Sequence, residues 1–118
     1  MAKEWDRQGW AVKALNALAH DSRLQVHRLL VRAGEQGLSA GAIAEELGMP
    51  ASSLSFHLMH LQGADMVRQR REGRSLIYSV NFDCMNQLME YLRENCCQGV
   101  QCRPAALRSA KPRQKIRA

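Results

Sequence analysis

The most constraining stretch of this chain runs from Ser39 to Leu61, where two short amphipathic segments flank a tight break. Ser39 is placed to cap the first segment, because its hydroxyl can accept a hydrogen bond from a first-turn amide. Gly48 suits the left-handed position after a helix, and Pro50 suits the first turn of the next one. The apolar residues of the first segment recur at helical spacing, at Ala40, Ile43, Ala44 and Leu47. The stretch therefore predicts two helices joined by a short turn.

The second segment carries an apolar stripe of Leu54, Leu58 and Leu61. Its other faces carry polar side chains short enough to reach the base edges and phosphates of DNA, namely Ser52, Ser53, Ser55, His57 and His60. This layout is typical of a helix-turn-helix whose second helix enters a major groove, although an ordinary helical hairpin has the same pattern. His57 and His60 could instead pair as metal ligands, but the sequence offers them no third ligand.

A predicted β-hairpin follows the two helices and carries a group of arginines. From Met66 to Arg70 the apolar period changes from 3.6 to 2, the next four residues predict a turn over 71–74, and 75–80 alternate again. An isolated hairpin of this kind is usually a solvated turn. Directly after a helix-turn-helix it predicts a wing whose arginines contact the phosphate backbone or enter a minor groove; these are Arg70, Arg71 and Arg74.

Three further helices are expected, over 3–18, over 23–33 with Asp21 or Ser22 as the cap, and from a cap at Asn81 to about 95. Trp5 and Trp10 in the first suit either a core or a homodimer interface. The apolar stripe of the last helix has little core left to cover; its residues are Met85, Leu88, Met89 and Leu92. We therefore expect a mostly α-helical, winged helix-turn-helix fold with a small β-hairpin, which dimerises through its first and last helices and binds a palindromic double-stranded DNA operator.

Charge and composition divide the chain into three parts: 1–95 for DNA binding and dimerisation, 96–102 with three cysteines, and a basic tail over 103–118 that is expected to be disordered. The net charge of +6 is misleading, because the tail holds 6 of the 17 basic residues and none of the 11 acidic ones. The body is therefore neutral overall. No apolar run is long enough for a membrane span and the N-terminus lacks a signal peptide, so a cytoplasmic protein without a membrane partner is expected.

The order of these elements resembles the ArsR/SmtB family of metal-responsive repressors. Residues 19–24, AHDSRL, resemble the family's entry to its second helix, and residues 55–58, SFHL, resemble its recognition-helix signature. The resemblance covers residues 10–95 and implies a winged-helix homodimer that represses transcription until an inducer binds. Two sensing sites of the family are absent. The Cys-x-Cys group on the first helix of the helix-turn-helix would fall within residues 38–42, which contain no cysteine. The Asp/His/Glu zinc site on the terminal helix needs a histidine, and no histidine follows His60.

The inducer site is therefore expected at Cys96, Cys97 and Cys102, just past the last helix. Thiolates select soft ions, and three of them suit a pyramidal, lone-pair ion such as As(III) or Sb(III) better than a structural zinc, which needs four ligands. Neighbouring residues of a helix do not face one another, so the three thiols converge only if the chain leaves the helix near Asn95. We expect As(III) or Sb(III) as the inducer and no permanent cofactor.

Several alternatives stay open for these cysteines. The pair could be inert, could form a thiol redox switch beside Arg93 and Arg103, or could bind Cd(II), Pb(II), Zn(II) or Cu(I). Cys84 is expected to be buried rather than a ligand. Cys97 to Arg103 has the Cys-x5-Arg spacing of Cys-dependent phosphatases and arsenate reductases, but that chemistry needs a preceding strand and a following helix. A helix precedes this segment and Pro104 follows it, so no enzyme is expected.

Overall fold

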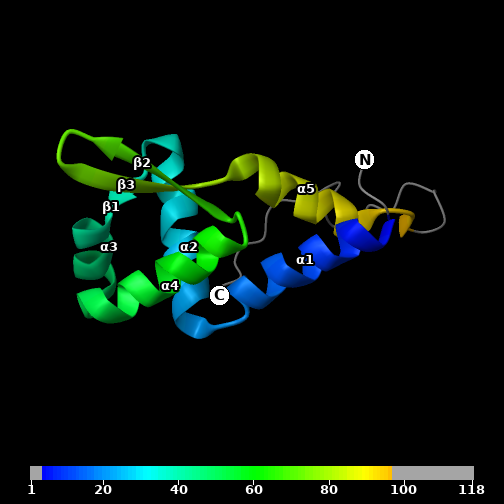
Figure 1. Ribbon diagram of the computed structural model, residues 1–118, viewed down its shortest axis with the longest axis horizontal. Helices are drawn as coiled ribbons and strands as arrows, with labels where there is room; N and C mark the ends of the chain where they lie inside the picture. Colours follow the sequence, from blue (N-terminus) through cyan, green and yellow to red (C-terminus); the bar gives the residue numbers. More distant parts are fainter. Residues whose placement is uncertain (1–3, 97–118) are drawn as a thin grey trace, which may run out of the picture.

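Five α-helices and a three-stranded antiparallel sheet form the computed structural model, which describes residues 4–96 (Figure 1). The mostly helical fold with a β-hairpin is confirmed. The inducer residues Cys97 and Cys102, and the basic tail, lie outside the described residues. In chain order the elements are α1 (Glu4–Leu18), α2 (Asp21–Ala33), the 3-10 turn η1 (Gly34–Gln36), β1 (Leu38–Ser39), α3 (Ala40–Leu47), α4 (Ala51–Gly63), β2 (Val67–Glu72), β3 (Ser75–Val80) and α5 (Phe82–Arg93).

The core forms where the apolar stripes of α2, α3 and α4 meet the inner face of the sheet. The large side chains at its centre are fully removed from water, and their burial supplies most of the stabilisation; they are Val26, Leu30, Ile43, Leu54, Leu58, Leu61 and Met66. The predicted stripes of α3 and α4 both contribute to this set, whereas the predicted stripe of α5 contributes none of it, and only Leu88 of that stripe is buried. The helix-turn-helix is therefore held rigidly on the body of the domain.

Helices α1 and α5 lie side by side and extend away from this core (Figure 1). Helix α1 buries three small residues, Ala11, Ala14 and Ala17, and Trp10 packs half-buried against the core. Arg7 of α1 forms an ion pair with Glu94, and its guanidinium lies 4.9 Å from the ring centre of Tyr91. The first helix is thereby tied to the end of the last one.

The sheet contains a strand that the sequence did not predict. β1 pairs with β3, which in turn pairs with β2, so the strand order is β1-β3-β2. Gly37 makes this pairing sterically allowed, because a Cβ there would lie 2.3 Å from the Tyr78 carbonyl oxygen. A two-residue strand has no detectable sequence period, which explains why it was missed.

The capping residues of three helix ends were predicted correctly, and that of a fourth was not. The Ser39 hydroxyl accepts from the Ala42 amide at 3.1 Å, Gly48 is left-handed with φ 63°, and the Asn81 side chain accepts from the Cys84 amide. The prediction that Asp21 or Ser22 caps α2 is wrong. The cap is His20, whose Nδ1 accepts from the backbone amide of Ser22.

The hairpin turn is shorter than predicted. Strand β2 continues to Glu72 and β3 begins at Ser75, so only Gly73 and Arg74 form the turn. Arg71 is therefore a residue of strand β2, and the alternation along the strand fixes the face of the sheet on which its side chain lies. No helix within residues 4–96 is long and apolar enough to cross a membrane.

Candidate nucleic-acid interface

Helix α4 presents a continuous exposed surface beside its buried stripe. Ser52, Ser53 and Ser55 are all exposed, in agreement with the expected facing of these side chains. Two apolar residues that the sequence reasoning missed lie on the same helix: Phe56 is 52% exposed and Met59 is 62% exposed. Apolar side chains on the helix that enters the major groove, here called the reading helix, can contact thymine methyl groups. Phe56 and Met59 follow Ser52 by four and seven residues, and this helical spacing places all three on one face, so the sequence did contain a signal for their exposure.

The prediction that His57 lies on this exposed surface is wrong. Its side chain is only 8% exposed, and its ring lies 4.8 Å from the ring of His20, centre to centre. Within residues 4–96 its Nδ1 has no hydrogen-bond partner. Burial lowers the pKa of His57, and the nearby charges of His20, Arg23 and His60 lower it further. His57 is thus a core residue of α4 in this structure, not an exposed polar one.

The arginines of the hairpin divide between its two faces. Cross-strand pairing places Arg68, Arg70 and Glu72 on the outer face, whereas Arg71 shares the inner face with buried Val67 and Tyr78. This follows from the period of two along a strand. Arg71 lies at the far end of the inner face and Arg74 lies in the turn, and both are exposed.

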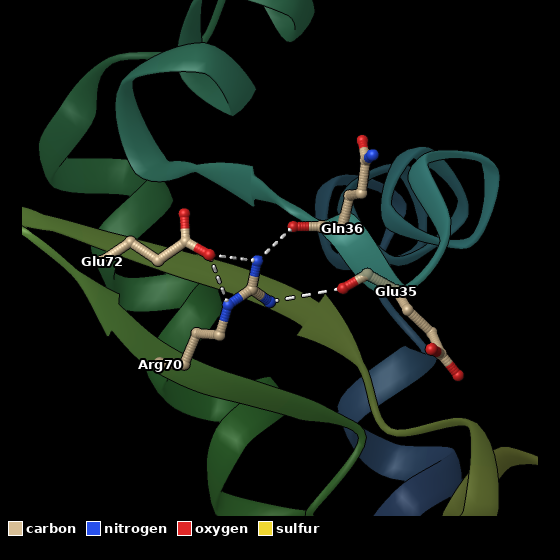
Figure 2. A network of polar contacts seen from close by, with 4 residues as sticks. All are labelled: Glu35, Gln36, Arg70 and Glu72. Atoms are coloured by element: carbon tan, nitrogen blue, oxygen red, sulfur yellow. Dashed lines mark hydrogen bonds and ion pairs between the residues drawn. The ribbon is translucent and has the colours of Figure 1, made fainter.

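Figure 2 shows that Arg70 is engaged with the protein itself. Its Nη2 donates to the Gln36 carbonyl oxygen at 2.8 Å, its Nη1 donates to the Glu35 carbonyl oxygen at 3.3 Å, and its Nε donates to Glu72 at 3.1 Å. The carbonyls belong to η1, at the end of α2, where backbone acceptors lack intrahelical partners. Arg70 therefore joins the wing to the end of α2.

Arg71 and Arg74 differ from Arg70 in that neither forms an ion pair with any residue of the described part of the chain. Arg68 lies 3.8 Å from the Asp83 carboxylate, an exposed pair that contributes little to stability. Two unpaired guanidinium groups at the end of the hairpin are suited to charge-assisted contacts with phosphates. They are the hairpin residues best placed to contact a DNA backbone.

The cysteines occupy two environments. Cys84, in the first turn of α5, is half-buried and accepts a hydrogen bond from the Asn81 amide nitrogen at 3.2 Å. Burial, followed by the carboxylates of Asp65 and Asp83, raises the pKa of its thiol, so Cys84 is a poor nucleophile. Helix α5 ends at Arg93, Asn95 has a left-handed φ of 59°, and Cys96 after it is exposed. The expected end of the helix near Asn95 is confirmed.

No metal site is assembled within residues 4–96, where no three histidine, cysteine or acidic side chains lie close enough to hold an ion. The expected chelate includes two residues outside that range, Cys97 and Cys102, and it stays a prediction. Several large apolar side chains of α1 and α5 are exposed, namely Val12, Leu15, Met89 and Leu92.

Comparison with known proteins agrees with this architecture. Residues 18–70 match the helix-turn-helix domain model HTH_20. The chain is 31% identical over 91 residues to the transcriptional activator HlyU of Vibrio cholerae, covering 77% of this chain and 82% of that protein. These relatives are transcriptional regulators rather than enzymes.

Two solved structures extend the likeness to three dimensions. An ArsR-like transcriptional regulator from Rhodococcus sp. RHA1 superposes with a TM-score of 0.70 at 21% identity, over 78% of this chain and 84% of that one, which shows the shared fold. The homodimeric winged helix-turn-helix DNA-binding domain of Mb0332 from Mycobacterium bovis is 26% identical, with a TM-score of 0.60 over 87% of this chain and 99% of that chain. The chain therefore belongs to the ArsR/SmtB family of winged helix-turn-helix transcriptional regulators.

Proposed function

We propose that this regulator is a dimeric repressor that binds a palindromic operator and is released when As(III) or Sb(III) binds to Cys96, Cys97 and Cys102. In the DNA complex α4 lies in a major groove, with Ser52 and Ser55 at the base edges and Phe56 against a thymine methyl. Arg71 and Arg74 contact the backbone from the wing. Arg70 holds the wing in place instead of contacting DNA.

The apolar surface of α1 and α5 supports the dimer. Val12, Leu15, Met89 and Leu92 are each between 42% and 55% exposed on the two neighbouring helices, and apolar side chains gathered in this way mark protein–protein interfaces. A twofold pairing of these two helices covers all four residues in both subunits. The homodimeric domain from Mycobacterium bovis has the same fold, and two equivalent reading helices match the two half-sites of a palindrome.

The single observation that carries the inducer assignment is the sequence NCCQGVQC, which begins at Asn95, two residues after the end of α5. Cys96 is exposed, and the chain departs from helical geometry at Asn95, as a chelate with Cys97 and Cys102 requires. Arsenous acid forms one As–S bond with each thiol; each thiol gives up its proton, and one hydroxide leaves as water for every bond formed. The product is a neutral, pyramidal centre that needs no fourth ligand.

The contacts of Arg7 suggest how this binding reaches the DNA. Arg7 of α1 pairs with Glu94, two residues before Cys96, and lies against Tyr91. Closing a chelate at Cys96 changes the path of the backbone beside Glu94, so the contact between α1 and α5 changes with it. Because these helices form the proposed dimer surface, the spacing of the two reading helices shifts. Couplings of this kind are about 1–3 kcal/mol, or roughly 5–150-fold in affinity.

The test is a titration of the operator-bound protein with As(III), Sb(III), Cd(II), Pb(II) and Zn(II), followed by fluorescence anisotropy of labelled operator. As(III) and Sb(III) are expected to release the DNA at the lowest concentrations. Cys96→Ser, Cys97→Ser and Cys102→Ser are each expected to bind operator normally and to lose this release. Cys84→Ser is the matched control and is expected to respond like the wild type. Loss of the response in Cys84→Ser alone, or release by an oxidant and not by As(III), would show that the inducer assignment is wrong.

A further inference from the structure

An open cleft lies where the ends of α1 and α4 meet the start of α2. Its volume is about 560 Å³, and its walls include Lys13 and Asn16 of α1, Arg23 of α2, and Met59 and His60 of α4. None of its lining residues is acidic. We call it the basic cleft.

No acidic side chain of the described residues forms an ion pair with the cationic groups of the basic cleft. Within residues 4–96, neither Lys13, Arg23 nor His60 forms an ion pair. His57, three residues before His60 on α4, has its pKa lowered by burial and then by the charges of His20, Arg23 and His60. Like charges collected without a counter-ion repel one another, and a bound anion relieves that repulsion.

The donors of the basic cleft are held in position. The Nε of Arg23 donates to the Ala17 carbonyl oxygen at 2.7 Å, which anchors the guanidinium at the end of α1. The ring of His60 lies 4.6 Å from the ring of Phe56 in an edge-on contact. A guanidinium and an imidazole donor that are already held in place bind an oxyanion with less loss of side-chain entropy than mobile groups would.

The basic cleft continues the exposed surface of α4. Phe56, Met59 and His60 follow one another along the helix, and the last two also line the cleft. In Figure 1 the hairpin and α1 lie on different sides of α4. A major groove is about 12 Å wide and is bounded by a phosphate backbone on each side. If the wing contacts one of these backbones, the basic cleft lies toward the other.

We propose that the basic cleft is a phosphate-binding site, which in the operator complex holds a backbone phosphate at the edge of the groove that α4 enters. Lys13 and Arg23 supply the charge, and Asn16 and His60 supply further hydrogen-bond donors. The identity of the phosphate as part of an operator rests on the proposed function, whereas phosphate binding by the cleft does not. The site adds a DNA anchor on α1, outside both the helix-turn-helix and the wing.

The first arm of the test compares Lys13→Gln with Arg32→Gln. Both side chains are exposed and both changes remove one positive charge, but Arg32 lies near the other end of α2, outside the cleft. The operator itself is first obtained by in vitro selection. Lys13→Gln is expected to weaken operator binding several-fold and to reduce the slope of log K against log[salt] by about 0.9. Arg32→Gln is expected to leave the slope unchanged. Replacing operator phosphates one at a time by methylphosphonate is expected to weaken the wild type at one position that no longer matters in Lys13→Gln.

The second arm uses inorganic phosphate and the DNA-free protein, observed by amide NMR shifts of α1 and α4. Millimolar phosphate is expected to shift these signals in the wild type and in Arg32→Gln, but not in Lys13→Gln. Phosphate binding that Lys13→Gln abolishes, with an unchanged salt slope on DNA, supports the site and assigns it to a soluble phosphate compound. If Lys13→Gln behaves like the wild type in both arms, the proposal is overturned. If the wild type binds no operator, the proposed function fails while the phosphate titration still decides the cleft.

Discussion

His27 and His57 each bury a ring nitrogen that no described group satisfies: Nε2 of His27 and Nδ1 of His57. A buried polar atom without a partner costs about 1–3 kcal/mol, and adding a proton to such a ring costs more because the charge is also desolvated. Accordingly, burial lowers the pKa of both side chains. Both histidines are therefore neutral in the folded protein near pH 7.

The stability of the fold is expected to fall as the pH drops below about 6.5, the pKa of an unperturbed histidine. In this range the unfolded chain binds protons that the buried rings do not, so stability is full above that value and is lost below it. Urea unfolding at pH 7.5 and at pH 5.5 measures the difference, in a window where carboxylates titrate little. His27→Gln is expected to show a shallower pH dependence than the wild type. An equal or steeper dependence in that variant would contradict the assignment.

The burial of the His57 side chain shows how far the sequence predicts the position of a single residue. His57 follows Leu54 by three positions and precedes Leu61 by four, so its spacing placed it on the buried stripe. Its polarity argued for the solvent face, and the sequence reasoning gave polarity too much weight. The contact with His20 comes from the cap residue of α2, 37 positions earlier in the chain, and no local pattern could predict it.

At the scale of elements, the wing combines a residue that positions it with residues free to contact DNA. Arg70 and Arg71 are neighbours in the sequence, but successive side chains of a strand point to opposite faces of the sheet, so the two arginines lie on different faces. The sequence correctly predicted a basic hairpin in this place. It could not predict the carbonyls of Glu35 and Gln36 as partners of Arg70, because that contact joins segments 34 and 35 residues apart.

Lysine substitutions separate the two roles within the wing. Arg70→Lys keeps the charge but loses the planar fork that reaches two carbonyls and Glu72 at once, so operator affinity is expected to fall several-fold at an unchanged salt slope. Arg71→Lys keeps a phosphate contact and is expected to bind almost normally, whereas Arg71→Ala is expected to lower the slope by about 0.9. Binding measured between 50 and 300 mM salt distinguishes these outcomes. If instead Arg70→Lys is normal and Arg70→Ala lowers the slope, Arg70 contacts DNA as the sequence first suggested.

At the scale of the whole molecule, the fold separates a compact DNA-binding body from a projecting pair of helices (Figure 1). The order of helices, the caps of α3 and α5, and the hairpin could be predicted because each depends on local spacing and local hydrogen bonds. The basic cleft could not be predicted, since α1, α2 and α4 each contribute a part of it. The exposure of Met89 and Leu92 on α5 was anticipated because too many apolar residues remained for one small core, although Leu88 of the same stripe is buried.

Charged substitutions on α5 test whether that surface pairs two subunits. Leu92→Glu is expected to raise the dimer dissociation constant by roughly two orders of magnitude, because the loss of about 1.5 kcal/mol of apolar burial occurs twice in a twofold interface. Sedimentation equilibrium measures the constant. Leu24→Glu is the matched control, since Leu24 is 43% exposed on α2, away from this surface. A dimer unaffected by Leu92→Glu would place the interface elsewhere.

Because α1 and α5 lie side by side, the tryptophan fluorescence of the protein comes from the region next to the end of α5. Both tryptophans of the chain, Trp5 and Trp10, belong to α1, and the ion pair of Arg7 with Glu94 joins that helix to the segment leading into the cysteines. Tryptophan emission thus originates entirely from the helix that contacts the end of α5. An unlabelled sample carries its own emission probe at this end of the molecule, separate from the reading helix, and ligand-induced changes there can be followed without attaching a dye.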